Sequence, residues 1–358
     1  MIKAAIVGCG KVADQHAQQI HRIRGATLVA VCDTEPLMAQ QMAERFKVER
    51  YFGDTSDMLE ASKPDVVHIT TPPQTHFALG KLCLEAGCSV YIEKPFTLDA
   101  GAADELITLA SGLDLKVTAG HNALFTPAMI RMRDLVRSGY LGGHPIHMES
   151  TYCYDLGDPA YAHALLGNSG HWIRTLPGSL LQNIISHGIS KIAEFLTTDS
   201  PSVIAHGFTS TFLKTIGQPD IIDEARVIIS DQGSTAYFTF SSQIRPSLHQ
   251  FRLYGPAASL LIDDDHQIVI KTDDKEYKSY LRYFIPPFLY AKQYADNAIG
   301  NFRKFVTSEF HLPFDAGLKT LIEAFYASIC NSTPPPIPYR DILLTAKIMD
   351  DIFAQMKT

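Results

Sequence analysis

Short apolar runs and segments with helical spacing alternate through the first third of the chain. The apolar runs predict strands at 3–7, 27–32, 65–70, 89–92 and 115–118. The helical patterns between them fall at 12–23, 35–46, 75–87 and 99–111. Continuous apolar runs indicate strands buried on both faces, and this alternation predicts a parallel sheet with right-handed crossovers. A doubly wound α/β domain is therefore expected here.

The rhythm changes after about residue 125. A helix is predicted over 127–138, and extended runs follow at 145–154, 202–213, 224–230, 234–241, 248–254, 258–262 and 267–271. Short turns join neighbouring runs, which predicts antiparallel pairing and a second, mostly antiparallel sheet. Helical patterns return at 287–306, 315–330 and 340–357.

The final helix carries an apolar stripe that another part of the chain has to cover. Its members recur every three or four residues: Ile342, Ala346, Met349, Phe353 and Met356. We therefore expect a doubly wound domain over 1–122, an α+β domain over 123–340, and a helix over 341–358 that packs back on the chain.

Composition and charge exclude several classes of protein. The 358 residues carry a formal net charge of −7 and no basic run of five or more residues, which argues against a nucleic-acid binder. No apolar run is long enough to cross a membrane, and no leader precedes the first strand. The six cysteines show no metal-ligand spacing, so no metal site is predicted and a reducing cytoplasmic setting is expected.

A glycine-rich turn follows the first predicted strand. The segment Gly8-Cys9-Gly10-Lys11-Val12-Ala13 fits the pattern G-x-G-x-x-G/A, with a strand before it and a helix after it. In a dinucleotide site the first glycine permits the tight turn, the second lets the backbone approach the pyrophosphate, and the small third residue permits close helix packing. The helix N-terminus then offers free N–H groups and a positive dipole to the phosphates.

Asp33 ends the second predicted strand, twenty residues after Ala13. Its carboxylate is expected to accept hydrogen bonds from the adenosine ribose hydroxyls and to repel a 2′-phosphate. The next residues, Thr34-Glu35-Pro36, supply no cation for that phosphate, so NAD is favoured over NADP. A glycine turn without a dinucleotide is the alternative interpretation.

Further segments resemble the glucose–fructose oxidoreductase/inositol dehydrogenase/rhizopine-catabolism family (Gfo/Idh/MocA) of NAD(P)-dependent oxidoreductases. In the first domain they are Thr70-Thr71-Pro72-Pro73-Gln74-Thr75-His76, Glu93-Lys94-Pro95 and Gly120-His121-Asn122, and the resemblance continues to Ser138-Gly139-Tyr140-Leu141-Gly142. In the second domain the resemblance is looser and rests on Trp172-Ile173-Arg174 and on Pro177-Gly178 through Asn183 to His187.

The resemblance implies a Rossmann domain followed by an α/β domain with a large open, mostly antiparallel sheet. It places the cofactor across the carboxyl ends of the parallel strands and the substrate between the domains. The cofactor-binding residues it implies, together with those of the glycine turn, are Gly8, Gly10, Lys11, Val12, Ala13, Asp33, Thr71, Pro72, His76, Glu93, Lys94 and Asn122.

Lys94 and His187 are the candidate catalytic pair. A lysine at the carboxyl end of a parallel strand can hydrogen-bond a substrate oxygen and stabilise its developing charge, although a surface lysine paired with Glu93 is the plainer interpretation. His187 can act as general base, or can be a packed imidazole bonded to a carbonyl. Asn183 stands where many relatives have Asp; Asn can hydrogen-bond but cannot act as a base. Relatives acting on nucleotide-linked sugars also have Asn there.

Tyr154, Trp172 and Arg174 are candidates for substrate contacts, together with Lys94, Asn183 and His187. Tyr152 is a further aromatic candidate, and ordinary packing is the alternative for each tyrosine. The run Asp263-Asp264-Asp265 is interpreted as a solvated hairpin tip rather than a metal site.

The leading hypothesis is an enzyme that oxidises a secondary hydroxyl of a sugar, sugar derivative or nucleotide sugar to a ketone with NAD. A redox-neutral enzyme that cleaves glycosidic bonds with a cycling bound NAD is the second hypothesis. A non-catalytic NAD-binding sensor is the third. An open sheet with one uncovered face also predicts a homodimer or homotetramer through the second domain.

Overall fold

Two compact units make up the protein. The computed structural model describes residues 1–168, 170–306 and 313–356. The first unit comprises 1–122, 175–178 and 318–350, and the second collects the other described residues. The boundary after residue 122 coincides with the predicted one. Residues 318–340, however, group with the first unit, whereas the sequence analysis assigned them to the second domain.

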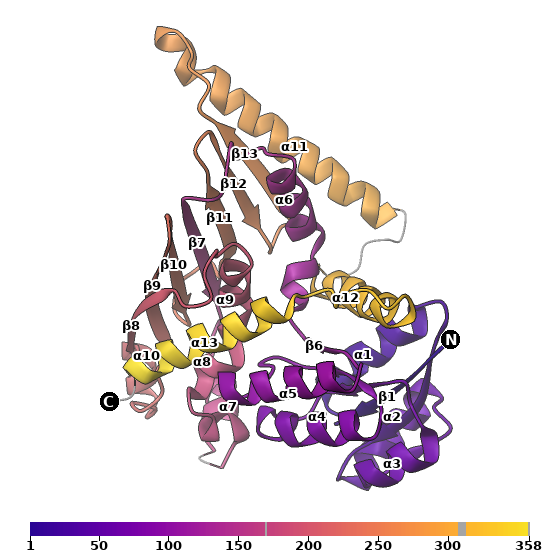
Figure 1. Ribbon diagram of the computed structural model, residues 1–358. Helices are drawn as coiled ribbons and strands as arrows, with labels where there is room; N and C mark the ends of the chain where they lie inside the picture. The colour runs from indigo at the N-terminus through magenta and orange to yellow at the C-terminus, as the bar shows by residue number, and fades with distance from the viewer. Residues whose placement is uncertain (169, 307–312, 357–358) are drawn as a thin grey trace. The chain divides into compact units, whose positions relative to one another are not determined.

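The sheet of the first unit has six parallel strands in the order β3-β2-β1-β4-β5-β6. The strands are β1 (Ile2–Val7), β2 (Ala26–Cys32), β3 (Tyr51–Phe52), β4 (Val66–Ile69), β5 (Ser89–Ile92) and β6 (Val117–Ala119). The helices are α1 (Lys11–Arg22), α2 (Pro36–Phe46), α3 (Thr55–Ser62), α4 (His76–Glu85) and α5 (Ala100–Gly112). This order confirms the doubly wound sheet, and Figure 1 shows α4 and α5 running side by side.

Strand β3 and helix α3 were not predicted. The strand has only two residues, and the helix buries only Met58 and Leu59. Neither segment therefore shows the apolar pattern that a sequence-based assignment needs.

Two C-terminal helices contribute to the first unit. They are α12 (Pro313–Cys330) and α13 (Tyr339–Met356), and the unit takes them from Leu318 and up to Asp350. The Tyr339 hydroxyl accepts a hydrogen bond from the backbone of Val117 on β6. Of the apolar stripe on α13, Ile342, Met349, Phe353 and Met356 are buried, so the chain itself covers it.

The second unit is built on a seven-stranded sheet in the order β13-β12-β11-β7-β10-β9-β8. Its strands are β7 (His147–Cys153), β8 (Ser202–Phe208), β9 (Glu224–Asp231), β10 (Ser234–Ser241), β11 (His249–Tyr254), β12 (Ala258–Asp263) and β13 (Ile268–Asp273). Five of its pairings are antiparallel, as predicted. β7 and β10 pair in parallel because a long connection, and not a turn, separates them in the chain.

Helices cover parts of this sheet, and one extended run was predicted too long. The helices are α6 (Pro127–Arg137), α7 (Pro159–Leu166), α8 (Ser179–Ile184), α9 (Ser186–Ala193), α10 (Thr211–Thr215) and α11 (Ile285–Val306). α9 contacts β7 and β10, while α6 and α11 contact β13. The run predicted over 202–213 ends as β8 at Phe208, because Ser210 caps the short helix α10 with its side chain. No described helix has an apolar stretch that could cross a bilayer.

A buried ion pair fixes α9 against the turn between β12 and β13. Lys191 and Asp264 are paired, and each side chain is only 4% exposed. Asp264 is therefore buried, and the interpretation of this turn as fully solvated was wrong for that residue. His266 and Asp263 form an exposed pair in the same turn. Within the described residues no three His, Cys, Asp or Glu side chains are arranged to hold a metal ion.

Replacing Asp264 by Asn is expected to destabilise the protein by about 3 kcal/mol, because it leaves the Lys191 ammonium buried without a counter-charge. Chemical denaturation measures the loss. The matched variant Asp263→Asn removes only a partner of an exposed histidine and is expected to change stability by less than about 0.5 kcal/mol. Equal effects of the two variants would contradict the assignment.

Candidate active site

The glycine turn packs against the end of the neighbouring strand. Gly8 has a φ of +93°, and a Cβ built there would lie 2.8 Å from the backbone nitrogen of Thr71. The Thr70 hydroxyl donates a 2.6 Å hydrogen bond to the carbonyl oxygen of Gly8. Only glycine satisfies both the left-handed backbone and this close approach.

Gly10 faces open space instead. A Cβ at Gly10 would meet no protein atom within 4 Å, and the residue precedes α1 without a side-chain hydrogen bond capping the helix. Lys11 and Val12 are exposed on the first turn, while Ala13 is fully buried. The start of α1 thus carries no capping side chain and lies beside a glycine surface, which is the arrangement that a pyrophosphate requires.

Asp33 is held by backbone N–H groups at the tip of β2. Cys9 donates a 2.7 Å hydrogen bond to its Oδ2, and Glu35 donates a 2.9 Å hydrogen bond to its Oδ1. Because each carboxylate oxygen can accept more than one hydrogen bond, both remain able to receive ribose hydroxyls. The hydrogen bond from Cys9 also ties the carboxylate directly to the glycine turn.

His76 lies between two of the strand ends rather than at the surface. It is fully buried; its Nδ1 is 2.9 Å from the carbonyl oxygen of Pro95, and its Nε2 is 3.0 Å from that of Thr71. Pro72, by contrast, is exposed and Thr71 half-buried. His76, predicted to contact the cofactor, therefore has a backbone carbonyl beside each ring nitrogen and donates its N–H to one of them, between the segments that carry Thr71 and Lys94.

Glu93 ends a chain of buried polar groups that begins on α12. The Tyr326 hydroxyl lies 2.7 Å from His68 Nε2, and His68 Nδ1 lies 2.9 Å from His16 Nδ1. His16 Nε2 is then 3.0 Å from Glu93 Oε1. With one proton on each imidazole, Tyr326 donates to His68, His68 to His16, and His16 to the Glu93 carboxylate, so every bond has one donor and one acceptor. A Cβ at Gly120 would lie 2.8 Å from Glu93 Oε1, which explains glycine there.

The charge state of Glu93 follows from these contacts. Burial by itself raises its pKa, but the hydrogen bond from His16, the electrostatic interaction with that ring and the charge of Lys94 outweigh burial, and the pKa lies below its usual value. Burial likewise lowers the pKa of His68 well below its usual value, in keeping with a neutral ring. The carboxylate is therefore ionised and oriented at the end of β5.

Lys94 follows Glu93 at the carboxyl end of β5, where the sequence analysis placed it. Burial lowers the pKa of Lys94, and the charge of Glu93 opposes that shift. Burial also lowers the pKa of His121 to about 4, with Glu93 and Lys94 acting in opposite directions. His121 Nδ1 has no hydrogen-bond partner among the described residues, and Asn122 begins the following turn, η2 (Asn122–Phe125). A buried imidazole nitrogen without a partner in the described chain thus lies in the electrostatic surroundings of Lys94.

His187 and Asn183 belong to the second unit, and they lie on two short helices. Asn183 is in α8 and His187 in α9, with Ile185 between them in the right-handed helical region. The His187 ring stacks on Tyr152 with centroids 5.5 Å apart. Tyr152 is buried, which raises its pKa, and His249 meets its ring edge-on at 4.4 Å. The imidazole plane is therefore fixed by an aromatic ring.

The remaining substrate candidates of the second unit differ in how many hydrogen bonds they form within the protein. Tyr154 and Tyr161 share a hydrogen bond between their hydroxyls, and Trp172 is half-buried. Arg174 donates to the Leu166 carbonyl, to Gln218 and to Asp220. These hydrogen bonds join the end of α7 to the segment after α10. The Arg174 guanidinium therefore already has protein partners, which favours a structural role over substrate recognition.

Comparison with known proteins now adds to this geometry. The signature of an oxidoreductase family with an NAD-binding Rossmann fold, Gfo/Idh/MocA, matches residues 2–121. The Gfo/Idh/MocA signature thus covers the first unit up to its boundary at residue 122. It is 34% identical to D-glucoside 3-dehydrogenase of Escherichia coli over 39% of this chain and 40% of that one. It is 32% identical to UDP-N-acetylglucosamine 3-dehydrogenase of Acidithiobacillus ferrooxidans over 42% and 44% of the two chains. These matches span about two fifths of the relatives' length.

Over nearly the whole chain, sequence identity to other proteins is lower, but the similarity of fold is clear. Identity to myo-inositol 2-dehydrogenase of Thermotoga maritima is 21% over 85% of this chain and 87% of that one. An NAD binding oxidoreductase from Klebsiella pneumoniae superposes with a TM-score of 0.79 at 19% identity, covering 99% and 96% of the two chains. The chain thus shares the fold of that structure, as the resemblance in its sequence implied.

The residues of the first unit fit the NAD that the family signature implies. The glycine surface at Gly10 and the uncapped start of α1 suit the pyrophosphate, Asp33 suits the ribose, and Lys94 and His121 provide polar groups at the end of β5. When bound, NAD accepts a hydride from carbon, and the protein supplies orientation and proton transfer. The contacts of His76 with two backbone segments support a structural role for that residue.

Two parts of this site were missed from the sequence. The buried chain of His16, His68 and Tyr326 joins residues up to 258 positions apart, and its only signal was a histidine within a buried strand, at His68. The stack of Tyr152 on His187 was also not anticipated as a pair, although both residues were candidates.

Two glycine substitutions are expected to separate folding from cofactor binding. Gly8→Ala introduces a strained backbone and a clash with Thr71, and is expected to lower the free energy of unfolding by about 3 kcal/mol or more. Gly10→Ala meets no protein atom, so stability stays within about 0.5 kcal/mol while NAD affinity falls at least roughly tenfold. Denaturation and titration calorimetry measure the two effects. Normal NAD binding by Gly10→Ala would rule out the phosphate site.

His16→Leu tests the charge of Glu93 through pH. In the native protein the pKa of Glu93 is depressed, so its ionised form stabilises the fold above the unfolded pKa and this contribution is lost as pH falls through the folded one. Without His16, burial dominates and the folded pKa rises. The stability deficit of the variant is therefore expected to be larger at pH 7 than at pH 5, by about 1.4 kcal/mol per unit of pKa change. The exposed His21→Leu on the same helix is the control; a deficit independent of pH argues against an ionised Glu93.

Proposed function

We propose that this protein is an NAD-dependent dehydrogenase that oxidises a secondary hydroxyl of a sugar, sugar derivative or nucleotide sugar to a ketone. The observation that carries the proposal is Lys94 at the carboxyl end of β5, next to a Glu93 carboxylate that His16 holds in place. Open α/β sheets bind ligands at the carboxyl ends of their strands. The names of the glucoside, inositol and UDP-N-acetylglucosamine dehydrogenases above support this substrate class.

In this proposal Lys94 and His187 have different roles toward the substrate hydroxyl. The Lys94 ammonium donates a hydrogen bond to the reacting hydroxyl and stabilises the negative charge that develops on its oxygen. His187 accepts the proton of that hydroxyl as the C–H bond breaks, because an imidazole titrates near neutral pH. Asn183 orients the substrate by hydrogen bonding, since an amide cannot accept the proton as a base.

NAD is preferred over NADP because Asp33 presents a carboxylate where a 2′-phosphate would lie. Two backbone N–H groups fix this carboxylate, so it cannot turn away without breaking both hydrogen bonds. Thr34 and Glu35 add no cation beside it.

The open sheet of the second unit supports the expected homo-oligomer. Tyr237 of β10 and Ile228 of β9 are cross-strand neighbours, and 50% and 43% of their surfaces are exposed. Apolar neighbours of this kind favour pairing with another surface. Assembly through this sheet remains a proposal.

The test is a panel of sugars, glycosides and nucleotide sugars assayed with NAD and NADP, followed by Lys94→Met on the best substrate. The variant is expected to lose roughly 10²–10³-fold in kcat, because a donor to the developing charge is removed, while NAD affinity stays within about threefold. The exposed Lys81→Met, which breaks only a surface pair with Glu105, is the matched control.

Three outcomes separate the proposal from its alternatives. Formation of NADH in step with ketone supports the dehydrogenase. Glycoside cleavage without net NADH indicates the redox-neutral enzyme. NAD binding that survives Lys94→Met, with no turnover of any compound by the native protein, indicates a sensor.

A further inference from the structure

Helix α11 has its polar residues inside and its apolar residues outside. Its only buried residue is Asn297, although the helix spans 22 residues. Half of the large apolar side chains exposed in the described chain fall within 280–306. This distribution is the reverse of that expected for a helix packed on a core.

The polar residues on the inward face of α11 bind the backbone of the edge strand β13. β13 is an edge strand, and Asn297 donates to the carbonyl oxygen of Val269 and accepts from its N–H. Gln293 forms the same pair of hydrogen bonds with Lys271. Side-chain amides thus satisfy backbone groups that a free edge strand would leave unpaired. This face needs polar residues and leaves the apolar ones on the other side.

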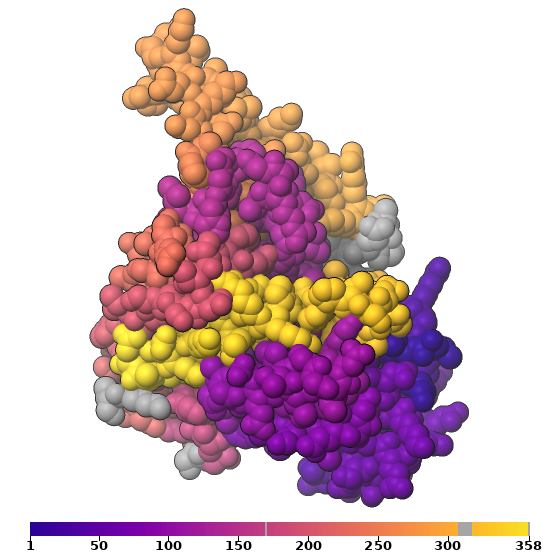
Figure 2. Space-filling view, in the orientation of Figure 1, coloured from indigo at the N-terminus to yellow at the C-terminus, as the bar shows by residue number. Residues whose placement is uncertain are grey.

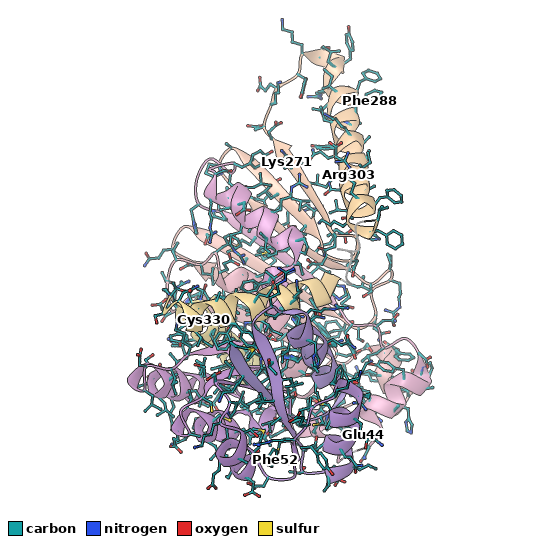
Figure 3. All side chains as sticks on the ribbon, turned by 90° about the vertical axis from the view of Figure 1, so that its right-hand side faces the viewer. Glu44, Phe52, Lys271, Phe288, Arg303 and Cys330 are labelled. Carbon is teal, nitrogen blue, oxygen red and sulfur yellow. The ribbon has the colours of Figure 1, made fainter. Side chains whose placement is uncertain are left out.

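The outward face carries a continuous stripe that we call the α11 stripe: Phe288, Ala291, Ala295, Ile299, Phe302 and Val306. These positions follow one another at intervals of three and four residues, which places them on one side of a helix. Phe288 is 76% exposed and Phe302 65%. Figure 3 shows side chains standing out from α11 beside the labelled Phe288, and Figure 2 shows this helix at the margin of its unit.

The exposed apolar surface of α11 and the turn before it, of which the α11 stripe is one part, is larger than a monomer usually presents. With each large apolar side chain about half exposed, α11 and the preceding turn η4 (Ser279–Tyr283) present on the order of 1,000 Å². The largest apolar patch of a typical monomer is roughly 300–600 Å². A standard interface takes about 800 Å² from each partner.

The order of residues in the stripe favours a second copy of the same chain as the partner. In a two-fold contact the same surface of both copies meets. The order of large and small side chains along the helix therefore has to be similar when it is followed from either end. Phe288 and Phe302 each lie seven residues from Ala295, and Ala291 and Ile299 each lie four. Across a two-fold axis at Ala295, Phe288 meets Phe302 of the second copy and the small alanines let the helices approach closely.

Charge does not oppose this register. Lys292 and Asp296 flank the stripe. In an antiparallel pair centred on Ala295, Lys292 lies opposite Ala298 of the second copy and Asp296 opposite its Tyr294. No like charges meet.

We propose that α11 is a homodimer interface in which the α11 stripe packs antiparallel against the same stripe of a second copy. This surface is separate from the open-sheet residues Ile228 and Tyr237, and the inference does not depend on the proposed reaction.

The first test measures the mass of the full-length protein in solution by light scattering. The double variant Phe288→Asp/Phe302→Asp is expected to halve the mass of the assembly, with the circular dichroism and thermal unfolding of a folded protein. Leu113→Asp, at another exposed apolar residue, is expected to leave the mass unchanged. A double variant of unchanged mass, or a monomeric native protein, overturns the proposal. A native monomer that sediments with phosphatidylglycerol vesicles but not with phosphatidylcholine ones assigns the stripe to a lipid surface instead.

The second test fixes the register by cysteine cross-linking. The other five cysteines are buried, so Cys330→Ser supplies a background without an exposed thiol. In that background Ala295→Cys is expected to form an inter-copy disulfide on mild oxidation, because the residue faces itself across the axis. Leu289→Cys, exposed on the same helix but off the stripe, is expected to remain reduced. Equal cross-linking of the two variants overturns the proposed pairing.

Discussion

The buried chain from Tyr326 to Glu93 is the interaction on which the candidate site depends. It joins α12, β4, α1 and the end of β5, all within the first unit, through three hydrogen bonds of 2.7, 2.9 and 3.0 Å. Each group is costly to bury alone, and each is stable here because its neighbour completes a hydrogen bond. One result is an ionised, oriented Glu93 beside Lys94. Another is that α1, whose start faces the cofactor, is locked to the strand that carries the lysine.

Much of the first unit could be predicted because its signals are local. The glycine turn, Asp33 and the strand that ends in Glu93-Lys94 each lie in a few consecutive residues, and the parallel topology follows from the alternation of strands and helices. The hydrogen bond from Cys9 to Asp33 then shows why the two parts of the fingerprint occur together. The grouping of 318–350 with this unit could not be predicted, because contacts such as Tyr326 with His68 join distant segments and leave no periodic trace.

Arg174 of the second unit and His76 of the first show that a sequence pattern does not determine what a side chain binds. Arg174 and His76 have the chemistry of ligand-binding residues, yet one is engaged by Leu166, Gln218 and Asp220 and the other by two backbone carbonyls. A residue type suggests what a group can bind; burial and neighbours decide what it does bind. His187 stays a candidate, and the stack on Tyr152 fixes the plane of its ring.

Helix α11 shows the same limit at the level of a whole element. Its periodicity predicts a helix over 287–306, and the structure has one over Ile285–Val306. Periodicity alone implies that the apolar side faces the core. The edge strand β13 reverses that direction, because its unpaired backbone groups require the amides of Gln293 and Asn297 and gain nothing from phenylalanine. A hydrophobic pattern therefore predicts only that the apolar face of a helix is covered by some other surface. Whether the same chain or another molecule covers it depends on what the opposite face of the helix has to satisfy.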